Sequence, residues 1–212
     1  MKTDYPPLSP ESVRDARLYG NREDMIRCLG IPRGAPIAEV GVAHGEFSEF
    51  LIETLAPSQF YAVDLFEMEK IPIHWGTPQE VLFQGKSHLD FYRSRFARLG
   101  SRLTLLRGDS AESARSIPDQ LLALAYIDAG HKFENVAADA AVCVQKVRPD
   151  GFLIFNDYVV YDPFIDEEYG VVAAVNELVA KGEWGIVGFA LQKHMFCDIA
   201  LRRRSFIGTA FL

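Results

Sequence analysis

Cysteine is scarce in this chain of 212 residues, and its three positions show no pattern. Cys28, Cys143 and Cys197 are odd in number, lie far apart and form no C-x-x-C pair. This usage argues against both a disulfide framework and a cysteine-based zinc site. Reduced thiols are typical of the cytoplasm, and we therefore predict a cytoplasmic location.

The sequence also lacks a long apolar run, so we expect no membrane-spanning helix and no membrane partner. Its first residues carry Asp4, Pro6 and Pro7 where a secretory signal would have an apolar core. We therefore expect no export signal.

Positive charge is in short supply, because 22 Lys and Arg residues face 29 Asp and Glu residues, giving a net charge of −7. Such a balance argues against nucleic acid as a partner. Apolar residues make up 49% of the chain, which is enough for a sizeable core. The length favours one domain over residues 1–212.

The chain does contain a strand, a glycine turn, a helix and a second strand over residues 36–64. Residues 37–42 are apolar and β-branched, as in a buried parallel strand, and residues 46–55 place apolar side chains on one helical face. The second strand, residues 59–63, ends at Asp64. Ligands of open α/β sheets bind beyond the carboxyl ends of the strands, so we expect the turn and Asp64 at a binding edge. An ordinary βαβ unit with a glycine turn is the simpler alternative.

The turn Gly41-Val-Ala-His-Gly45-Glu46 departs from the G-x-G-x-x-G pattern of dinucleotide sites. Ala43 replaces the second glycine, and Glu46 puts a negative charge where a pyrophosphate would meet the helix N-terminus. A nicotinamide oxidoreductase is therefore disfavoured, and a cofactor without phosphates suits the turn better.

The segment Glu39-Val-Gly41-Val-Ala-His-Gly45 resembles the first motif of class I S-adenosylmethionine (SAM)-dependent methyltransferases. Asp64 resembles the ribose-binding acid of their second motif. The resemblance implies that SAM is bound by Glu39, Gly41, Ala43, Gly45 and Asp64.

Asp109 and Ser110 follow the third expected strand, residues 103–106. In a methyltransferase they would face the adenine, because an acid can accept from its amino group and a small residue leaves room for the ring. The alternative is that one of them is the N-cap of the next helix, and both roles can hold at once.

Strands and helices alternate to the end of the chain, which predicts the fold class. Further strands are expected at residues 121–127, 152–155, 184–190 and 195–201, and helices at residues 9–18, 21–29, 87–99, 132–147 and 171–180. We predict an α/β fold with a doubly wound, mostly parallel seven-stranded sheet and a terminal antiparallel hairpin. Its resemblance to the methyltransferase sheet implies the strand order 3-2-1-4-5-7-6. We expect residues 1–30 to form a helical arm, and residues 65–100 an insertion or lid and a helix.

Polar side chains follow two neighbouring strands of this sheet. Asp128 ends the fourth strand, and Asn156 and Asp157 end the fifth, so all three are expected at the edge that holds the cofactor. Two carboxylates and an amide oxygen are hard ligands, which suit Mg²⁺ or another divalent cation. In the alternative, Asp128 lies near the methionine part of SAM without any metal, and Asp157 caps a turn.

His131 follows Asp128 by three residues and can point into the same space. An imidazole with a pKa near neutrality is a competent base for a substrate hydroxyl group. We predict that His131 and Asp128 are catalytic residues, with a helix N-cap or a surface position as the alternative for His131.

Two segments here resemble motifs of methyltransferase family 24, whose members act on small molecules. Tyr126-Ile-Asp128-Ala-Gly-His131-Lys-Phe-Glu134-Asn-Val-Ala-Ala-Asp139 resembles D-x-x-H-x-Y-E-x-V-x-x-D, with Phe133 in place of the tyrosine. Gly151-Phe-Leu-Ile-Phe-Asn156-Asp157-Tyr158 resembles G-G-x-x-x-x-H-D-Y, with asparagine in place of the histidine. In the more distant catechol O-methyltransferases an Asp-Asn pair after strand five holds Mg²⁺, and here that pair is reversed. We expect Glu134 and Asp139 on the solvated side of their helix.

These resemblances imply a SAM-dependent methyltransferase, and we predict methyl transfer to a hydroxyl group of a small molecule, assisted by a divalent cation. The alternatives are a metal-free methyltransferase with His131 as the base and a protein that binds SAM without catalysis. The apolar tail, residues 205–212, must be covered by its own domain or by a second subunit, so a homodimer is one expected arrangement.

Overall fold

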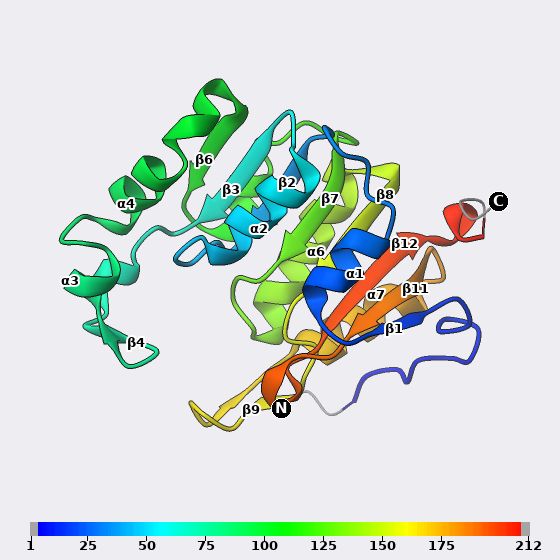
Figure 1. Ribbon diagram of the computed structural model, residues 1–212. Coiled ribbons are helices and arrows are strands. Elements are labelled where there is room, and N and C mark those ends of the chain that lie inside the picture. Colours follow the sequence, from blue (N-terminus) through cyan, green and yellow to red (C-terminus); the bar gives the residue numbers. More distant parts are fainter. Residues whose placement is uncertain (1–3, 209–212) are drawn as a thin grey trace.

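The computed structural model describes residues 4–208 and centres on one eight-stranded sheet (Figure 1). In sheet order the strands are β1 (Arg17–Tyr19), β11 (Trp184–Ala190), β12 (Asp198–Arg203), β8 (Val147–Phe155), β7 (Leu122–Ile127), β2 (Ile37–Val40), β3 (Phe60–Asp64) and β6 (Leu103–Arg107). β12 runs antiparallel to both of its neighbours, and the other pairs are parallel. From β6 to β11 this order is the predicted 3-2-1-4-5-7-6, so the α/β fold and its terminal hairpin are confirmed.

The eighth strand comes from the N-terminal arm, where the predicted helix over residues 9–18 is wrong. Residues 10–15 form turns, and β1 then pairs in parallel with the outer edge of β11. Ser9 and Pro10 therefore start only a turn, closed by the bond from the Ser12 amide to the Ser9 carbonyl (2.9 Å). The open edge of β11 offers backbone partners that favour an extended chain after this turn.

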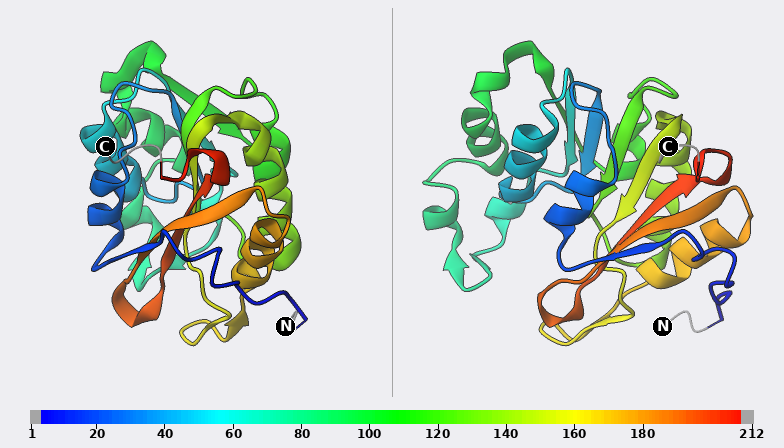
Figure 2. Two further views of the ribbon diagram at one scale, coloured as in Figure 1. Left: turned by 90° about the vertical axis from the view of Figure 1, so that its right-hand side faces the viewer. Right: turned by 45° about the vertical axis from the view of Figure 1, so that its right-hand side comes forward.

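Helices cover both faces of the sheet, as the edge-on view of Figure 2 shows. One face carries α1 (Arg22–Cys28) and α2 (Glu46–Leu55), and the other carries α5 (Ser110–Ala114), α6 (Phe133–Lys146) and α7 (Val171–Ala180). All six residues of β7 are buried, with Leu124 in the core on the α1 side and Ala125 in the core on the α6 side. Two-sided burial explains why β7 is apolar along its whole length, in place of the alternation of a half-exposed strand.

The insertion after β3 contains short elements: η1 (Met68–Lys70), β4 (Ile73–His74), β5 (Thr77–Pro78), α3 (Gln79–Leu82) and α4 (His88–Arg95). The predicted helix over residues 87–99 stops at Arg95 and continues as the 3₁₀ helix η2 (Ala97–Arg102). The insertion is tied to the glycine turn, because His88 Nε2 lies 2.6 Å from the Ala43 carbonyl oxygen and His44 Nε2 lies 3.0 Å from that of Leu82.

A second small hairpin, β9 (Tyr161–Asp162) and β10 (Glu167–Glu168), lies between β8 and α7. Within residues 4–208, no helix combines the length and the apolar character needed to cross a membrane. The last four residues of the predicted apolar tail, 209–212, lie outside the described residues.

Candidate active site

The turns after β2, β3, β6 and β7 enclose a cavity of about 290 Å³ at the carboxyl edge of the sheet. Six of the residues predicted to bind the cofactor line this cavity, namely Gly41, Ala43, Asp64, Asp109, Ser110 and Asp128. The remaining lining residues are Leu65, Met68, Gly108, Ala129, Gly130 and Asn135. The parallel topology thus brings together segments almost 90 residues apart in sequence, as expected for ligand sites of open α/β sheets.

Asp64 has a double role at this cavity. Its carboxylate accepts hydrogen bonds from the backbone amides of Val42 (2.8 Å), Ala43 (3.3 Å) and Phe66 (2.7 Å). A carboxylate has about four acceptor positions, so one remains for a ligand hydroxyl group. Asp64 therefore holds the glycine turn in place and still faces the cavity.

Glu39 and Gly45, also predicted to bind the cofactor, lie outside the lining of the cavity. Glu39 is 1% exposed and accepts a 2.5 Å hydrogen bond from the Ser48 hydroxyl group, and burial raises its pKa well above the usual value. Gly45 packs against the insertion, because a Cβ atom there would lie 2.8 Å from the ring of Phe96. Both residues therefore support the glycine turn by packing and do not line the cavity.

Asp109 is the N-cap of α5, since its carboxylate accepts from the Glu112 amide (3.0 Å), and it also lines the cavity with Ser110. The N-cap role is thus confirmed for Asp109, and the contact of Asp109 and Ser110 with an adenine stays a prediction.

Asp128, His131 and Asp157 form a cluster next to the cavity. His131 Nε2 lies 3.6 Å from Asp128 Oδ1 and 3.5 Å from Asp157 Oδ2, and one donor atom from each residue lies within 4.8 Å of the others. The imidazole ring stacks on Tyr169, with ring centres 4.3 Å apart and planes 7° apart. Asp157 adopts a left-handed backbone conformation (φ 51°), which is strained for a non-glycine residue and frequent at functional sites.

The cluster places a histidine between two carboxylates. Burial by itself lowers the pKa of His131, but Asp128 and Asp157 outweigh it and raise the pKa above the usual value. Burial, with the negative charge of Asp128, raises the pKa of Asp157 to about 6. The imidazolium form of His131 is therefore stabilised here, which suits a group that receives a proton.

Asn156 turns its amide nitrogen, and not its oxygen, toward the cluster. The nitrogen donates to Asp128 Oδ1 (2.8 Å), while the oxygen accepts from Gln192 (3.1 Å) and lies 3.3 Å from the Tyr126 hydroxyl oxygen. The oxygen that we predicted as a cation ligand thus points away from Asp157, and His131 supplies the third donor of the cluster.

Three side chains near Asn156 were missed by the sequence reasoning: Arg22, Gln192 and Asp198. Asp198 is fully buried, and burial raises its pKa to about 8, although Tyr126 and Arg22 favour the charged form. A lone acid within the apolar segment 195–201 was the one available signal.

Asp139 contradicts the expectation of a solvated position, because it is 1% exposed. Burial raises its pKa to about 6, although the nearby Ser110 side chain favours the charged form. Glu134 is exposed, as expected.

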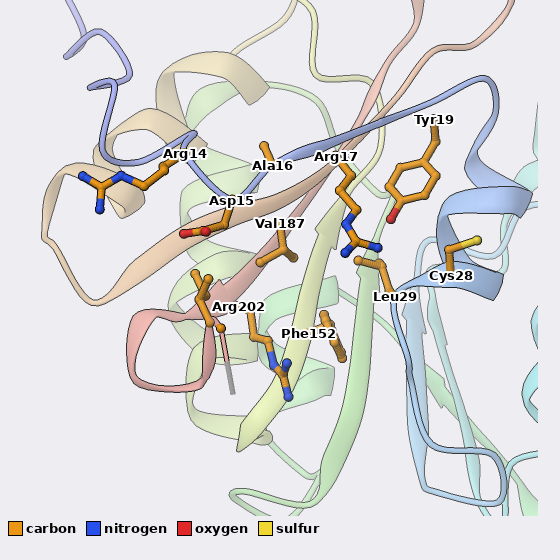
Figure 3. Close-up of a pocket in the computed structure, with 12 residues that line it drawn as sticks. Arg14, Asp15, Ala16, Arg17, Tyr19, Cys28, Leu29, Phe152, Val187 and Arg202 are labelled. Atoms are coloured by element: carbon orange, nitrogen blue, oxygen red, sulfur yellow. The ribbon is translucent and has the colours of Figure 1, made fainter. Parts of the chain in front are cut away.

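A second cavity, of about 310 Å³, opens beside β1 on the α1 face of the sheet (Figure 3). Arg17, Arg202, Tyr19 and Phe152 are among its lining residues. It shares no residue with the cavity at Asp64, and none of the predicted site residues lines it.

Known proteins match the chain at the level of family and fold. A model of methyltransferase family 24, described as "Methyltransferase domain", matches residues 38–158, which is more than half of the 212 residues. No curated protein matches the chain.

Three solved structures illustrate the likeness of fold. The O-methyltransferase TomG from Streptomyces achromogenes, in complex with SAM, has 15% identity and a TM-score of 0.60, over 86% of this chain and 79% of that one. An rRNA methylase from Streptococcus thermophilus has 15% identity and a TM-score of 0.57, over 86% and 93%. The cofactor-bound protein Rv0187 from MTB also has 15% identity and a TM-score of 0.57, over 95% and 84%. At such identities the structures share the fold, and the family match adds the activity: the chain belongs to this methyltransferase family and is a SAM-dependent methyltransferase.

Proposed function

We propose that this enzyme transfers the methyl group of SAM to a hydroxyl group of a small molecule. The main support for the proposal is that Asp128 both lines the cavity and lies close to His131, with 3.6 Å between its Oδ1 and His131 Nε2. If the cofactor occupies this cavity, His131 would be a proton acceptor next to it.

The cavity fits the polar parts of SAM. Asp64 has an acceptor position left for the ribose hydroxyl groups, and Asp109 and Ser110 provide an acceptor and space for an adenine. Gly41 and Ala43 let the backbone come close to the amino acid part of the cofactor. Glu46 at the start of α2 disfavours a phosphate there.

The chemistry needs one bond to form, one to break and one proton to move. The acceptor oxygen forms its bond to the methyl carbon as the carbon–sulfur bond breaks, leaving S-adenosylhomocysteine (SAH). The hydroxyl proton passes to neutral His131, and Asp128 and Asp157 stabilise the resulting imidazolium. General base catalysis of this kind contributes about 10²–10⁴-fold. Holding both reactants together supplies much of the remaining rate.

A divalent cation fits the same cluster. Asp128, Asp157 and His131 would hold it, with two oxygen donors and one nitrogen donor within 4.8 Å of one another. A mixed oxygen and nitrogen set suits Mn²⁺ or Zn²⁺ as well as Mg²⁺. When bound, the cation supplies Lewis acidity that lowers the pKa of the acceptor hydroxyl group. His131 is then a ligand, and without the cation it is the base.

A small acceptor is favoured over RNA by the charge of this edge. Asp157 is 16% exposed in its side chain, Asp128 26%, and β10 adds two exposed glutamates. These carboxylates repel a phosphate backbone.

The three cysteines are free thiols, which supports our proposal of a cytoplasmic location.

The test is transfer of a labelled methyl group from SAM to a panel of phenols, catechols and aliphatic alcohols, with matched amines and thiols. We expect turnover with members of the hydroxyl set. Turnover confined to amines or thiols would contradict O-methylation, and binding of SAH without any turnover would favour the non-catalytic alternative.

A further inference from the structure

A chain of buried polar side chains leads from the N-terminal arm to Asp128. Tyr126 on β7 and Asp198 on β12 are 0% exposed, and Asn156, just after β8, is 8% exposed. β12, β8 and β7 are consecutive in the sheet, so these side chains meet at its carboxyl edge. Arg22 reaches them from α1, which lies across this part of the sheet in Figure 1.

The contacts form one continuous series. Arg22 donates to the Tyr126 hydroxyl group (3.1 Å), which donates to Asp198 Oδ2 (2.6 Å). The Gln192 amide nitrogen donates to Asp198 Oδ1 and to Asn156 Oδ1 (3.1 Å). The Asn156 amide nitrogen then donates to Asp128 Oδ1 (2.8 Å).

The residues at the two ends of this series determine which atom donates and which accepts at each hydrogen bond. Arg22 can only donate, so the Tyr126 oxygen accepts and its proton goes to Asp198. At the other end the Asp128 carboxylate accepts from the Asn156 nitrogen, so the Asn156 oxygen faces Gln192, which presents its nitrogen to Asn156 and to Asp198 Oδ1.

The same nitrogen fixes Asn156, whose oxygen must face Gln192. A flipped Asn156 amide would put donor against donor at Gln192 and oxygen against carboxylate at Asp128. Buried polar groups without partners cost about 1–3 kcal/mol each, so the flipped form is disfavoured.

We propose that Asn156 is a positioning residue that works through its amide nitrogen, and that Arg22, Tyr126, Asp198 and Gln192 hold it in that orientation. Its hydrogen bond fixes Asp128 Oδ1, the same oxygen that lies 3.6 Å from His131 Nε2. The N-terminal arm thereby supports the active site through Arg22, which also stacks over Phe47 of α2, 4.0 Å from the ring centre. The inference rests on the proposed function in one respect, namely that Asp128 takes part in cofactor binding or in catalysis.

Two substitutions at Asn156 separate its nitrogen from its oxygen. Asn156→Ala removes both, whereas Asn156→Asp keeps an oxygen toward Gln192 and brings a second carboxylate against Asp128. A residue that works through its nitrogen should tolerate alanine better than aspartate. We expect SAH affinity to fall about tenfold in Asn156→Ala and further in Asn156→Asp, measured by calorimetry on the full chain.

Asn176 on α7 provides the matched control, because it is 4% exposed and has hydrogen bonds at both amide atoms, to Tyr158 and Pro6. It does not line the cavity. Asn176→Ala and Asn176→Asp should lower the melting temperature and leave SAH affinity unchanged. Equal losses of SAH affinity in the two series would overturn the proposal, as would an Asn156→Asp variant that binds SAH as well as the wild type.

A second measurement tests the proposal even if the Asn156 variants fail to fold. In ¹⁵N-labelled wild-type protein the side-chain amide protons of Asn156 should exchange slowly with solvent and resonate downfield, and Gln192→Ala should shift them. Rapid exchange, or no response to Gln192→Ala, would overturn the proposed orientation. Both results concern the protein without an acceptor, so they stand apart from the failure of methyl transfer.

Discussion

The backbone at Gly41 passes so close to Asp128 that a Cβ atom at residue 41 would lie 2.1 Å from the Asp128 carbonyl oxygen. The turn after β2 and the turn after β7 are therefore packed against each other at the floor of the cavity in which we propose that the cofactor binds. Gly41 also has a φ of 87°, which side chains rarely tolerate.

Gly41→Ala should therefore abolish cofactor binding. The clash is with backbone atoms, which cannot move aside without displacing Asp128, so we expect SAH affinity to fall at least 100-fold. Gly182→Ala is the control, because Gly182 has the same φ of 87° but nothing within 4 Å of an added Cβ atom. Calorimetric titration with SAH checks both variants, and equal losses would show that backbone strain alone is responsible.

Asp64→Asn should weaken SAH binding by about 10–100-fold, since charge-assisted hydrogen bonds contribute about 1.5–3 kcal/mol each. The amide keeps one oxygen but loses acceptors for the glycine turn and for the ribose. Asp162→Asn serves as a control, because Asp162 also accepts from the amide two residues ahead (2.8 Å) and lies outside the cavity. SAH affinity that is unchanged in Asp64→Asn would remove this residue from the site.

Asp139→Asn should make the protein less sensitive to pH. The pKa of Asp139 is raised by burial from 3.8 to about 6, so the folded state holds a proton that the unfolded state releases. Its contribution to stability is complete below about pH 4 and is lost as the pH rises through about 6. The loss corresponds to roughly 3 kcal/mol.

The measurement for Asp139 is urea unfolding of both proteins between pH 4 and pH 8. Relative to the wild type, Asp139→Asn should gain stability as the pH rises through this range. A difference between the two proteins that stays constant with pH would mean that Asp139 is ionised in the folded state.

Removal of divalent cations with EDTA distinguishes the two proposed roles of His131, which are proton acceptor and metal ligand. If it is the base, activity survives EDTA, and His131→Gln lowers kcat about 100-fold or more while SAH affinity changes little. If it is a ligand, EDTA removes activity, and His131→Gln weakens the calorimetric binding of Mn²⁺. Full activity of His131→Gln would remove the residue from the chemistry altogether.

The edge that carries the site follows from local patterns, whereas the strand order is implied by the resemblance to the methyltransferase sheet. β3 and β7 are short apolar runs that lead into an acidic residue, since Asp64 ends β3 and Asp128 follows β7. The parallel topology then brings these ends together without further information.

Features decided by distant partners could not be derived in this way. β1 has three residues, and only pairing with the edge of β11, some 170 positions away, makes it a strand. The orientation of Asn156 depends on Gln192 and Asp198, which have no pattern linking them to it in sequence. Asp139 is polar in a helical pattern but faces inward, because α6 packs against both the sheet and α5.

The central claim is that the cavity at Gly41, Asp64 and Asp128 holds the cofactor, and calorimetric titration of the wild-type chain with SAH tests it most directly. We predict one site per chain, with an affinity lowered by Asp64→Asn and unaffected by Asp162→Asn. An absence of SAH binding, or binding that Asp64→Asn and Gly41→Ala leave intact, would contradict the account.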